Sequence, residues 1–122
     1  MTTDARKTLG RVGERLAAEH LERLGWEIIA RNHQTRQGEI DLIAVDGDTL
    51  VFAEVKTCRV GRRLPWDSLH ERKRSQVRRL AGAWFAEQQP RPHFRRIRCD
   101  AIGIVLDERD TLVRLDHLKA AF

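Results

Sequence analysis

Two short apolar segments near the middle of the chain carry charged side chains that could do chemistry. The stretch GEIDLIAVDGDTLVFAEVK places Glu39 and Asp41 in the first segment and Glu54 and Lys56 in the second. Charge is unfavourable inside a sheet unless it is paired or solvated. The four residues therefore indicate one of two things: a solvent-exposed sheet edge whose apolar sequence only looks like that of a buried strand, or a functional site that requires charge.

Both segments have the length and composition of β-strands. Because side chains alternate across a strand, Glu39 and Asp41 should share one face with Ile43. Glu54 and Lys56 should likewise share one face of the second strand. The opposite face of each strand is apolar, so the charged faces are the ones available for a site.

The separator Asp46-Gly47-Asp48 is typical of a hairpin turn, and its length decides which charges meet. A turn of Gly47 and Asp48 would place Asp41 opposite Glu54 and Glu39 opposite Lys56. A turn of Asp46 and Gly47 would instead place Glu39 opposite Glu54. In either register the four groups lie on one face, at the end away from the turn. A three-residue loop without a bulge would break this arrangement.

Carboxylates that face each other across a strand pair repel, and one would take up a proton unless a cation stood between them. Oxygen ligands suit Mg²⁺ or Mn²⁺, which keep several waters and bind through carboxylates and substrate phosphate. Lys56 could then hold a phosphate oxygen or orient the attacking water. The pattern favours metal-assisted phosphodiester hydrolysis. The alternative is a simple ion-pair cluster on a solvated edge.

The first helix is predicted from apolar residues at helical spacing between Leu9 and Leu24, with Gly25 as the residue that ends it. Glu14 lies on the flank of this apolar stripe, where an acid can reach the edge of the sheet. It is either a further metal or water ligand or a solvated glutamate.

A second helix is predicted from Asp67 to Gln89, with an inner stripe of Leu69, Val77, Leu80 and Trp84. Lys73 falls on the side of this stripe, and Gln76 lies close by, about one turn from Lys73. We therefore expect Lys73 and Gln76 to face the catalytic pocket.

The charge balance is compatible with an anionic partner. The net charge is +5, and the chain contains nineteen arginines and four lysines. Because the arginine fork suits phosphate, Arg59, Arg62 and Arg63 could follow a nucleic-acid backbone from the loop after the second charged strand. A genome rich in arginine codons and a solvated loop explain the same residues.

The remaining segments complete the expected α/β architecture. Strands are predicted for WEIIARN (26–32), RIRCDAIGIVLD (96–107) and TLVRLDHL (111–118), with a polar loop over 33–38 and a turn over 108–110. The order is α-β-β-β-α-β-β, in which the second helix fits a right-handed crossover between parallel strands. We expect a single domain over residues 1–122 with a mixed central sheet flanked by helices.

Other classes of protein are disfavoured by the sequence. No apolar run is long enough to span a membrane, and the N-terminal segment lacks the apolar core of a signal peptide, so a cytoplasmic location is expected. Cys58 and Cys99 are too few for a disulfide framework and lack metal-ligand spacing with the histidines. We expect two reduced thiols that take part in packing.

The chain resembles the YraN-type family of small, poorly characterised bacterial proteins with a restriction-endonuclease-like fold. The resemblance runs from LGRVGERLAAEHLERLGWEIIARN through GEIDLIA and VFAEVKT to RCDAIGI and LDHLKAAF, which is most of the chain. GEIDLIA followed by an EVK strand is far more specific than the general D…ExK nuclease pattern. The pattern is also similar to that of Holliday-junction resolvases, which carry a glutamate in their first helix.

The resemblance implies an αβββαβ core and assigns roles to five residues. Asp41 and Glu54 would be metal ligands, Lys56 the catalytic lysine, Glu14 the helix glutamate and Glu39 an accessory acid. Cys58 stands where arginine is expected after EVKT, and Cys99 stands where phenylalanine is expected. The first departure removes one phosphate contact.

We expect a Mg²⁺- or Mn²⁺-dependent enzyme that hydrolyses DNA, with branched or repair DNA as a substrate by analogy. A homodimer is compatible with this expectation, since two sites cut two strands symmetrically. The alternative is a nucleic-acid-binding or adaptor module that keeps the nuclease scaffold and does not cleave DNA.

Overall fold

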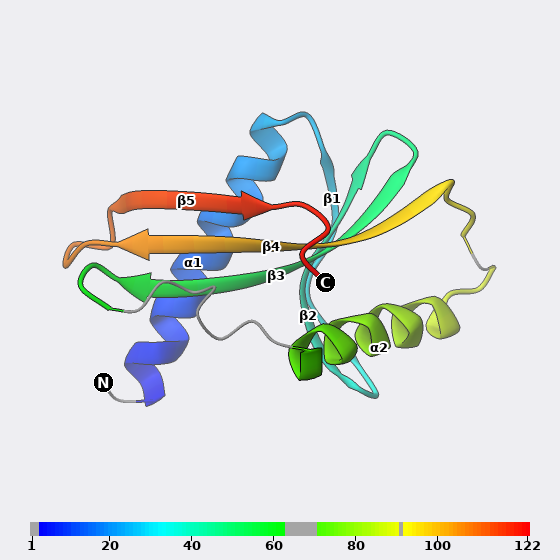
Figure 1. The fold of residues 1–122 in the computed structure, drawn as a ribbon, viewed down its shortest axis with the longest axis horizontal. Coiled ribbons are helices and arrows are strands. Elements are labelled where there is room, and N and C mark those ends of the chain that lie inside the picture. The colour runs from blue at the N-terminus through cyan, green and yellow to red at the C-terminus, as the bar shows by residue number, and fades with distance from the viewer. Residues whose placement is uncertain (1–2, 63–70, 91) are drawn as a thin grey trace.

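The chain forms a five-stranded mixed sheet packed against two helices, in a computed structural model that describes residues 3–62, 71–90 and 92–122 (Figure 1). The elements are α1 (Thr3–Arg23), β1 (Glu27–Thr35), β2 (Gly38–Asp46), β3 (Thr49–Arg59), α2 (Glu71–Glu87), β4 (Arg96–Leu106) and β5 (Leu112–Leu118). The strands are arranged in sequence order, and β3 and β4 are parallel while the other neighbours are antiparallel. The predicted element order and the mixed sheet are confirmed.

Helix α1 ends where the sequence predicts. Gly25 adopts a φ of 87°, a left-handed conformation that glycine accepts without strain. The amide of Gly25 donates to the carbonyl of Glu22 at 2.9 Å, and the amide of Trp26 donates to that of Leu21 at 3.1 Å. These two bonds form a Schellman motif, which satisfies carbonyl groups at the end of the helix and turns the chain into β1.

The hairpin between β1 and β2 is tighter than the sequence suggests. The predicted polar loop over residues 33–38 is wrong, because β1 continues to Thr35 and β2 begins at Gly38, which pairs with Thr35. The Thr35 hydroxyl donates to the Gly38 carbonyl at 2.8 Å. Strand pairing at an exposed edge satisfies the backbone N–H and C=O groups whatever the polarity of the side chains. For this reason the polar residues here extend the two strands instead of forming a loop.

The hairpin between β2 and β3 adopts the first of the two predicted registers. Asp46 pairs with Thr49, so Gly47 and Asp48 form the turn, and the paired ladder extends to Leu42 and Ala53. This register aligns Asp41 with Glu54 just beyond the last pair.

The regular alternation of side chains is interrupted in β2. Ile40 and Ile43 both pack in the apolar cluster beneath α2, although they are three residues apart. The prediction that Asp41 shares the face of Ile43 is wrong, because its carboxylate lies beside Glu14 of α1, which covers the other face. Strand β1 is irregular at the same level, where Asn32 has a φ of 50°. Both strands therefore depart from a regular pleat near Asp41.

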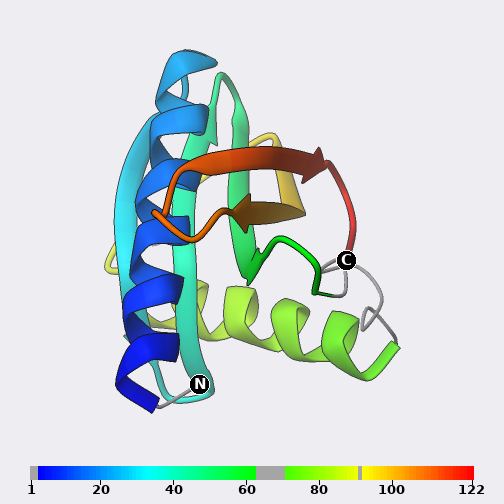
Figure 2. The same cartoon turned by 90° about the vertical axis from the view of Figure 1, so that its left-hand side faces the viewer.

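Each helix covers its own apolar face of a strongly twisted sheet (Figures 1 and 2). Ala17 and Leu21 of α1 are completely buried against Leu42, Val51 and Ile104. A second cluster lies beneath α2, in which the Trp84 ring is 5.6 Å from that of Phe52 and 5.0 Å from that of Phe85. The central strands β2 and β3 are thus held from both sides.

Helix α2 buries the predicted stripe, since Val77, Leu80 and Trp84 are all buried, and Leu80 and Trp84 belong to the cluster beneath α2. The predicted start of this helix at Asp67, and Leu69 of the stripe, fall outside the described residues. Cys58 and Cys99 are free thiols, as expected. Among the described segments, neither helix combines the length and apolarity that a membrane span requires.

A buried carboxylate joins the far end of α1 to β4 and β5. Asp100 is fully buried and accepts hydrogen bonds from Arg98, His117 and the amide of Ala120, at 2.7 to 3.0 Å. Burial raises the pKa of Asp100, but these bonds outweigh it and hold the pKa below its usual value. His117 contacts His20 of α1 at 3.1 Å between ring nitrogens, so the network links three elements.

Asp100→Asn should lower the free energy of unfolding by about 3–5 kcal/mol, because it removes the fully buried charge that pairs with the partly buried Arg98. Urea unfolding followed by circular dichroism measures this change. Asp116→Asn on β5 is the matched control, since it breaks a more exposed ion pair with Arg114 at 2.8 Å and should change stability by less than about 1 kcal/mol. Equal effects of the two substitutions would contradict the role given to Asp100.

Close packing of α1 on β3 occurs at Gly13, next to Glu14. A Cβ atom at this position would lie 2.8 Å from both Cβ and Cγ2 of Thr57, and nearer still to the Thr57 hydroxyl. Gly13→Ala should therefore destabilise the fold by about 1–3 kcal/mol, despite the better helix propensity of alanine.

The control for this prediction lies in the same helix. Gly10 has nothing within 4 Å of an added Cβ, so Gly10→Ala should leave stability unchanged or raise it by up to about 1 kcal/mol. Adding Thr57→Ala to Gly13→Ala should restore part of the loss, because it removes two of the three crowding atoms. Thermal unfolding of these three variants and the unaltered chain tests the contact.

Candidate metal centre

Three carboxylates converge where the ladder between β2 and β3 ends. Glu14 of α1 and Glu39 and Asp41 of β2 each offer one oxygen, and these three oxygens lie within 4.8 Å of one another. Glu14 and Asp41 are partly buried, whereas Glu39 is exposed. The structure thus brings together three of the predicted site residues.

Backbone and side-chain N–H groups hold the cluster. The Val55 amide donates to Oδ2 of Asp41 at 2.8 Å, which ties β2 to β3 beyond their last paired residues. Gln34 donates to Glu39 at 2.8 Å. The side chain of Asn32 forms a hydrogen bond with Glu14. Each acid therefore has a defined position before any ligand is present.

Glu54 lies near enough to Asp41 and Glu14 for its charge to act on both, and Lys56 is paired with Glu54. The Lys56 Nζ atom is 3.3 Å from a Glu54 carboxylate oxygen, and the Glu54 side chain is 12% exposed while that of Lys56 is 40% exposed. Glu54 lines a small cavity with Ile40, Val77 and Leu80 beneath α2. It is not one of the three acids whose oxygens converge. The prediction that all four charged groups share one face is therefore wrong for Glu54, although its charge acts on Asp41 and Glu14.

The electrostatics of the cluster are those of an uncompensated negative site. Burial, followed by the charges of Glu54, Glu14 and Glu39, raises the pKa of Asp41 from 3.8 to about 7, although the hydrogen bond from the Val55 amide lowers it. Burial also raises the pKa of Glu14, with Glu39 adding to the effect. Asp41 therefore holds a proton in much of the neutral pH range unless a cation takes its place.

The donor set and its spacing fit a hard divalent cation. Carboxylate oxygens are the ligands that Mg²⁺ and Mn²⁺ prefer. Two oxygens on one Mg²⁺ are at most roughly 4 Å apart, since each bond is about 2.1 Å long. The observed 4.8 Å limit is close enough that small side-chain rotations would complete the coordination.

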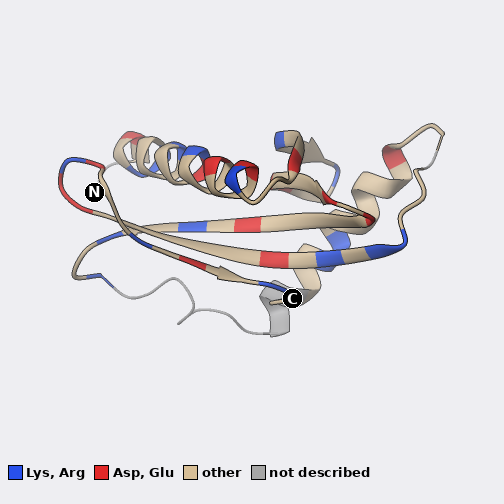
Figure 3. Ribbon diagram, turned by 90° about the horizontal axis from the view of Figure 1, so that it is seen from above, with Lys and Arg blue, Asp and Glu red and all other residues tan. Residues whose placement is uncertain are grey.

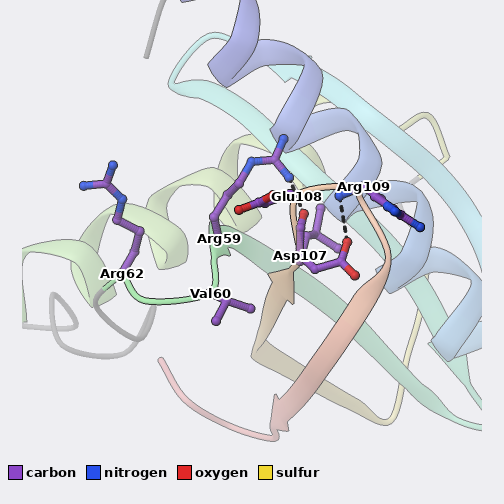
Figure 4. A pocket seen from close by; sticks show the side chains of 7 residues that line it. Arg59, Val60, Arg62, Asp107, Glu108 and Arg109 are labelled. Carbon is purple, nitrogen blue, oxygen red and sulfur yellow. Dashed lines mark hydrogen bonds between the residues drawn. The ribbon is translucent and has the colours of Figure 1, made fainter.

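The predicted phosphate-binding residues are placed differently from one another. Arg59, at the end of β3, is 2.7 Å from Asp110 and donates to the Asp107 carbonyl at 2.6 Å. It therefore anchors the turn between β4 and β5, and in Figure 4 Arg62 points away from it. Arg62 is exposed at a cavity of about 560 Å³. Its other lining residues are Arg59, Val60, Leu106, Asp107, Glu108 and Arg109.

The remaining predicted contacts are on or before α2. Arg63 and the side chain of Lys73 lie outside the described residues, and Gln76 is exposed on α2. Figure 3 shows basic and acidic segments interspersed along α1 and the strands. The excess positive charge of the chain is therefore not gathered on one face of the described ribbon in this view.

The hydrogen bonds from Asn32 and Gln34 were not predicted. A signal for Gln34 existed, because a tight hairpin closed by Thr35 and Gly38 places Gln34 opposite Glu39. For Asn32 the signal was weaker: asparagine is depleted in strand interiors and tolerates a positive φ. Neither residue was a candidate for the functional site on its side chain alone, since both side chains are neutral amides.

Comparison with known proteins identifies the family. Residues 13–104 match the model of the uncharacterised protein family UPF0102. A UPF0102 protein from Pelotomaculum thermopropionicum is 42% identical over 98% of each chain. One from Acidothermus cellulolyticus is 40% identical, with 99% of this chain and 98% of the relative covered, and one from Parafrankia sp. is 47% identical over 93% and 95%. The chain belongs to the UPF0102 family, the YraN-type family that its motifs resemble.

Mn²⁺ should stabilise the protein more at pH 8 than at pH 6. The raised pKa of Asp41 means that the folded state binds a proton between about pH 4 and 7 that the unfolded state has lost, so metal-free stability falls as pH rises through this window. A cation that replaces the proton should add about 2.7 kcal/mol at a concentration of 100 Kd. Thermal unfolding with Mn²⁺ or chelator at the two pH values measures the difference.

Asp41→Asn separates the two effects, because it removes the titrating group and leaves an oxygen to accept from Val55. It should raise metal-free stability at pH 8 and abolish the stabilisation by Mn²⁺. Asp48→Asn, at the tip of the β2–β3 hairpin where the side chain is 58% exposed, should behave as the unaltered protein. An unchanged response to Mn²⁺ in Asp41→Asn would contradict the assignment of this site.

Proposed function

We propose that this UPF0102 protein is a Mg²⁺- or Mn²⁺-dependent nuclease that hydrolyses DNA phosphodiester bonds. The observation that carries the proposal is the convergence of Glu14, Glu39 and Asp41 at one point, with the charge of Glu54 acting on two of them and Lys56 paired with Glu54. Acids that repel one another in a partly buried position, next to a lysine, fit a divalent cation and a phosphate better than they fit a structural ion pair.

The architecture supports a restriction-endonuclease-like fold. Helix α1, the three antiparallel strands β1 to β3, helix α2 and the parallel strand β4 follow the order αβββαβ. The acids lie where β2 and β3 cease to pair. The similarity of this pattern to Holliday-junction resolvases makes branched or repair DNA the favoured substrate, by analogy alone.

The metal would be held by the three converging acids Glu14, Glu39 and Asp41, and Glu54, the ligand expected from the family resemblance, would be a further one. When bound, such an ion polarises a phosphoryl oxygen and lowers the pKa of a coordinated water. To share the ion, Glu54 would have to turn away from Lys56, its partner at 3.3 Å. The Val55 amide keeps Asp41 in place throughout.

Lys56 supplies positive charge to the reacting phosphate. Its side chain is 40% exposed, so the ammonium group is accessible to a phosphate oxygen without any change in the backbone of β3. Negative charge develops on the phosphoryl oxygens and the leaving oxygen during hydrolysis, and a fixed cation stabilises it. The pairing with Glu54 orients Lys56 before the substrate binds.

The substrate backbone would be followed by Arg62, Arg63, Lys73 and Gln76. Arg62 follows β3 and Gln76 is exposed on α2, whereas Arg63 and Lys73 are assigned from the sequence alone. Arg59 has a structural role in the turn between β4 and β5, so we assign it no phosphate contact. Contacts of this kind would position DNA without reading its sequence.

Cleavage of linear, single-stranded and four-way-junction DNA with Mg²⁺, Mn²⁺ or chelator tests the proposal. Cutting should require the divalent ion. Asp41→Asn and Lys56→Ala should each lower the rate by about 10²–10³, since each removes charge at the reacting phosphate.

Lys119→Ala is the matched lysine control, because Lys119 lies over the Trp26 ring at 5.7 Å and takes no part in the site; its rate should be unchanged. DNA binding that persists in chelator, with no cutting of any substrate by the metal-loaded protein, would favour a binding or adaptor module. Cutting that survives both Asp41→Asn and Lys56→Ala would place the activity elsewhere.

A further inference from the structure

Each of the three converging carboxylates accepts a hydrogen bond from a neutral N–H group. Two of the donors are side-chain amides of the edge strand β1, and the third is the backbone amide of β3. The pairs are Asn32 with Glu14, Gln34 with Glu39, and Val55 with Asp41. The sequence-based assignment of the site gave β1 no part in it.

The register of the β1–β2 hairpin places both amides beside the acids. Gln34 pairs directly with Glu39, and Asn32 lies between the pairs Arg31 with Leu42 and His33 with Ile40. Asn32 is therefore level with Asp41. Asn32 and Gln34, two residues apart on β1, therefore lie opposite Asp41 and Glu39, two residues apart on β2.

The backbone at Asn32 is in an unusual conformation for a strand. Its φ of 50° lies in the left-handed region, which asparagine tolerates better than most residues but which still disfavours a regular ladder. A conformation of this kind persists where the surrounding structure requires it. Here it accompanies the bond that crosses from β1 to Glu14 on α1.

Neutral donors suit a carboxylate that is to bind a cation. A lysine or arginine would compensate the acid and repel the ion, whereas an amide N–H holds one lone pair and leaves the remaining lone pairs available. Partners of this kind orient metal ligands, and their loss typically lowers metal affinity 10–100-fold.

We propose that Asn32 and Gln34 are positioning residues that orient Glu14 and Glu39 as a preformed ligand set for a divalent cation. This inference rests on the proposed function of the same site. Gln34 holds Glu39 at 2.8 Å, and Asn32, level with Asp41, acts on Glu14, which is partly buried on another element. Gln34 supports an exposed acid within its own hairpin.

Mn²⁺ titration of the purified protein by isothermal calorimetry tests the positioning. Asn32→Gly keeps a residue that accepts a positive φ and removes only the amide, and it should weaken Mn²⁺ binding about tenfold or more. Gln34→Ala should weaken it by a smaller factor. Arg31→Ala is the matched control on β1, since it breaks an exposed ion pair with Glu22 at 3.4 Å and should leave Mn²⁺ affinity unchanged.

A second measurement does not depend on metal. An NMR pH titration of the Glu14 side-chain carboxyl in the metal-free protein should show a higher midpoint in Asn32→Gly than in the unaltered chain, because the bond from Asn32 favours the charged form. Gln34→Ala should leave that midpoint in place. Thermal unfolding of the variants shows whether the fold is retained.

Unchanged Mn²⁺ affinity in Asn32→Gly, or an unchanged Glu14 midpoint, would overturn the inference. Absence of Mn²⁺ binding in the unaltered protein would overturn the proposed function instead, and the Glu14 titration would still decide whether Asn32 positions this acid. The two failures are therefore distinguishable.

Discussion

Mutual repulsion among acids at the end of the β2–β3 ladder is the constraint on which the rest of this structure depends. Asp41 is held close to Glu14 and Glu39, and Glu54 lies near enough that its charge also opposes the ionisation of Asp41. Such a cluster disfavours folding unless other contacts hold it. The packing of α1 on β3, the Val55 amide and the two amides of β1 are the contacts that do so.

Helix α1 can carry a site residue because it is fixed on either side of Glu14. Gly13 brings the helix into close contact with Thr57 of β3. Farther along, His20 contacts His117, which is in turn held by buried Asp100. Between these points the helix buries an apolar stripe against β2, β3 and β4. A carboxylate on such a helix loses little further freedom when it binds a ligand, which favours a preformed site.

The register of the β2–β3 hairpin could be predicted from sequence because it follows from short-range rules. The turn at Gly47 and Asp48 and the period of two are local properties, and they aligned Asp41 with Glu54 correctly. The face of Asp41 was wrong because β1 and β2 depart from a regular pleat near Asn32, and no local signal announces that departure. Cross-strand pairing also overrode the polarity of residues 33–38.

Long-range partners explain the other differences. Arg59 looked like a phosphate ligand because it follows the charged strand, yet its partner is Asp110, which only the tertiary structure brings near. Asp100 gave no signal for the same reason, since its partners include His117 and Ala120 from beyond the β4–β5 turn. Charge in a sequence identifies residues that need a partner, and the fold decides whether that partner is another part of the chain or a ligand.

The placement of cations and neutral donors separates structural acids from the proposed metal-binding acids. Asp100 is compensated within the protein by an arginine and a histidine, and its pKa is lowered. Asp41 is more poorly compensated: it is oriented by a neutral amide, and its pKa is raised to about 7. A buried acid that receives hydrogen bonds but insufficient positive charge retains its affinity for a cation, and at neutral pH a proton and a divalent ion compete for it. The same repulsion that destabilises the metal-free protein therefore provides the free energy with which the site would bind its metal.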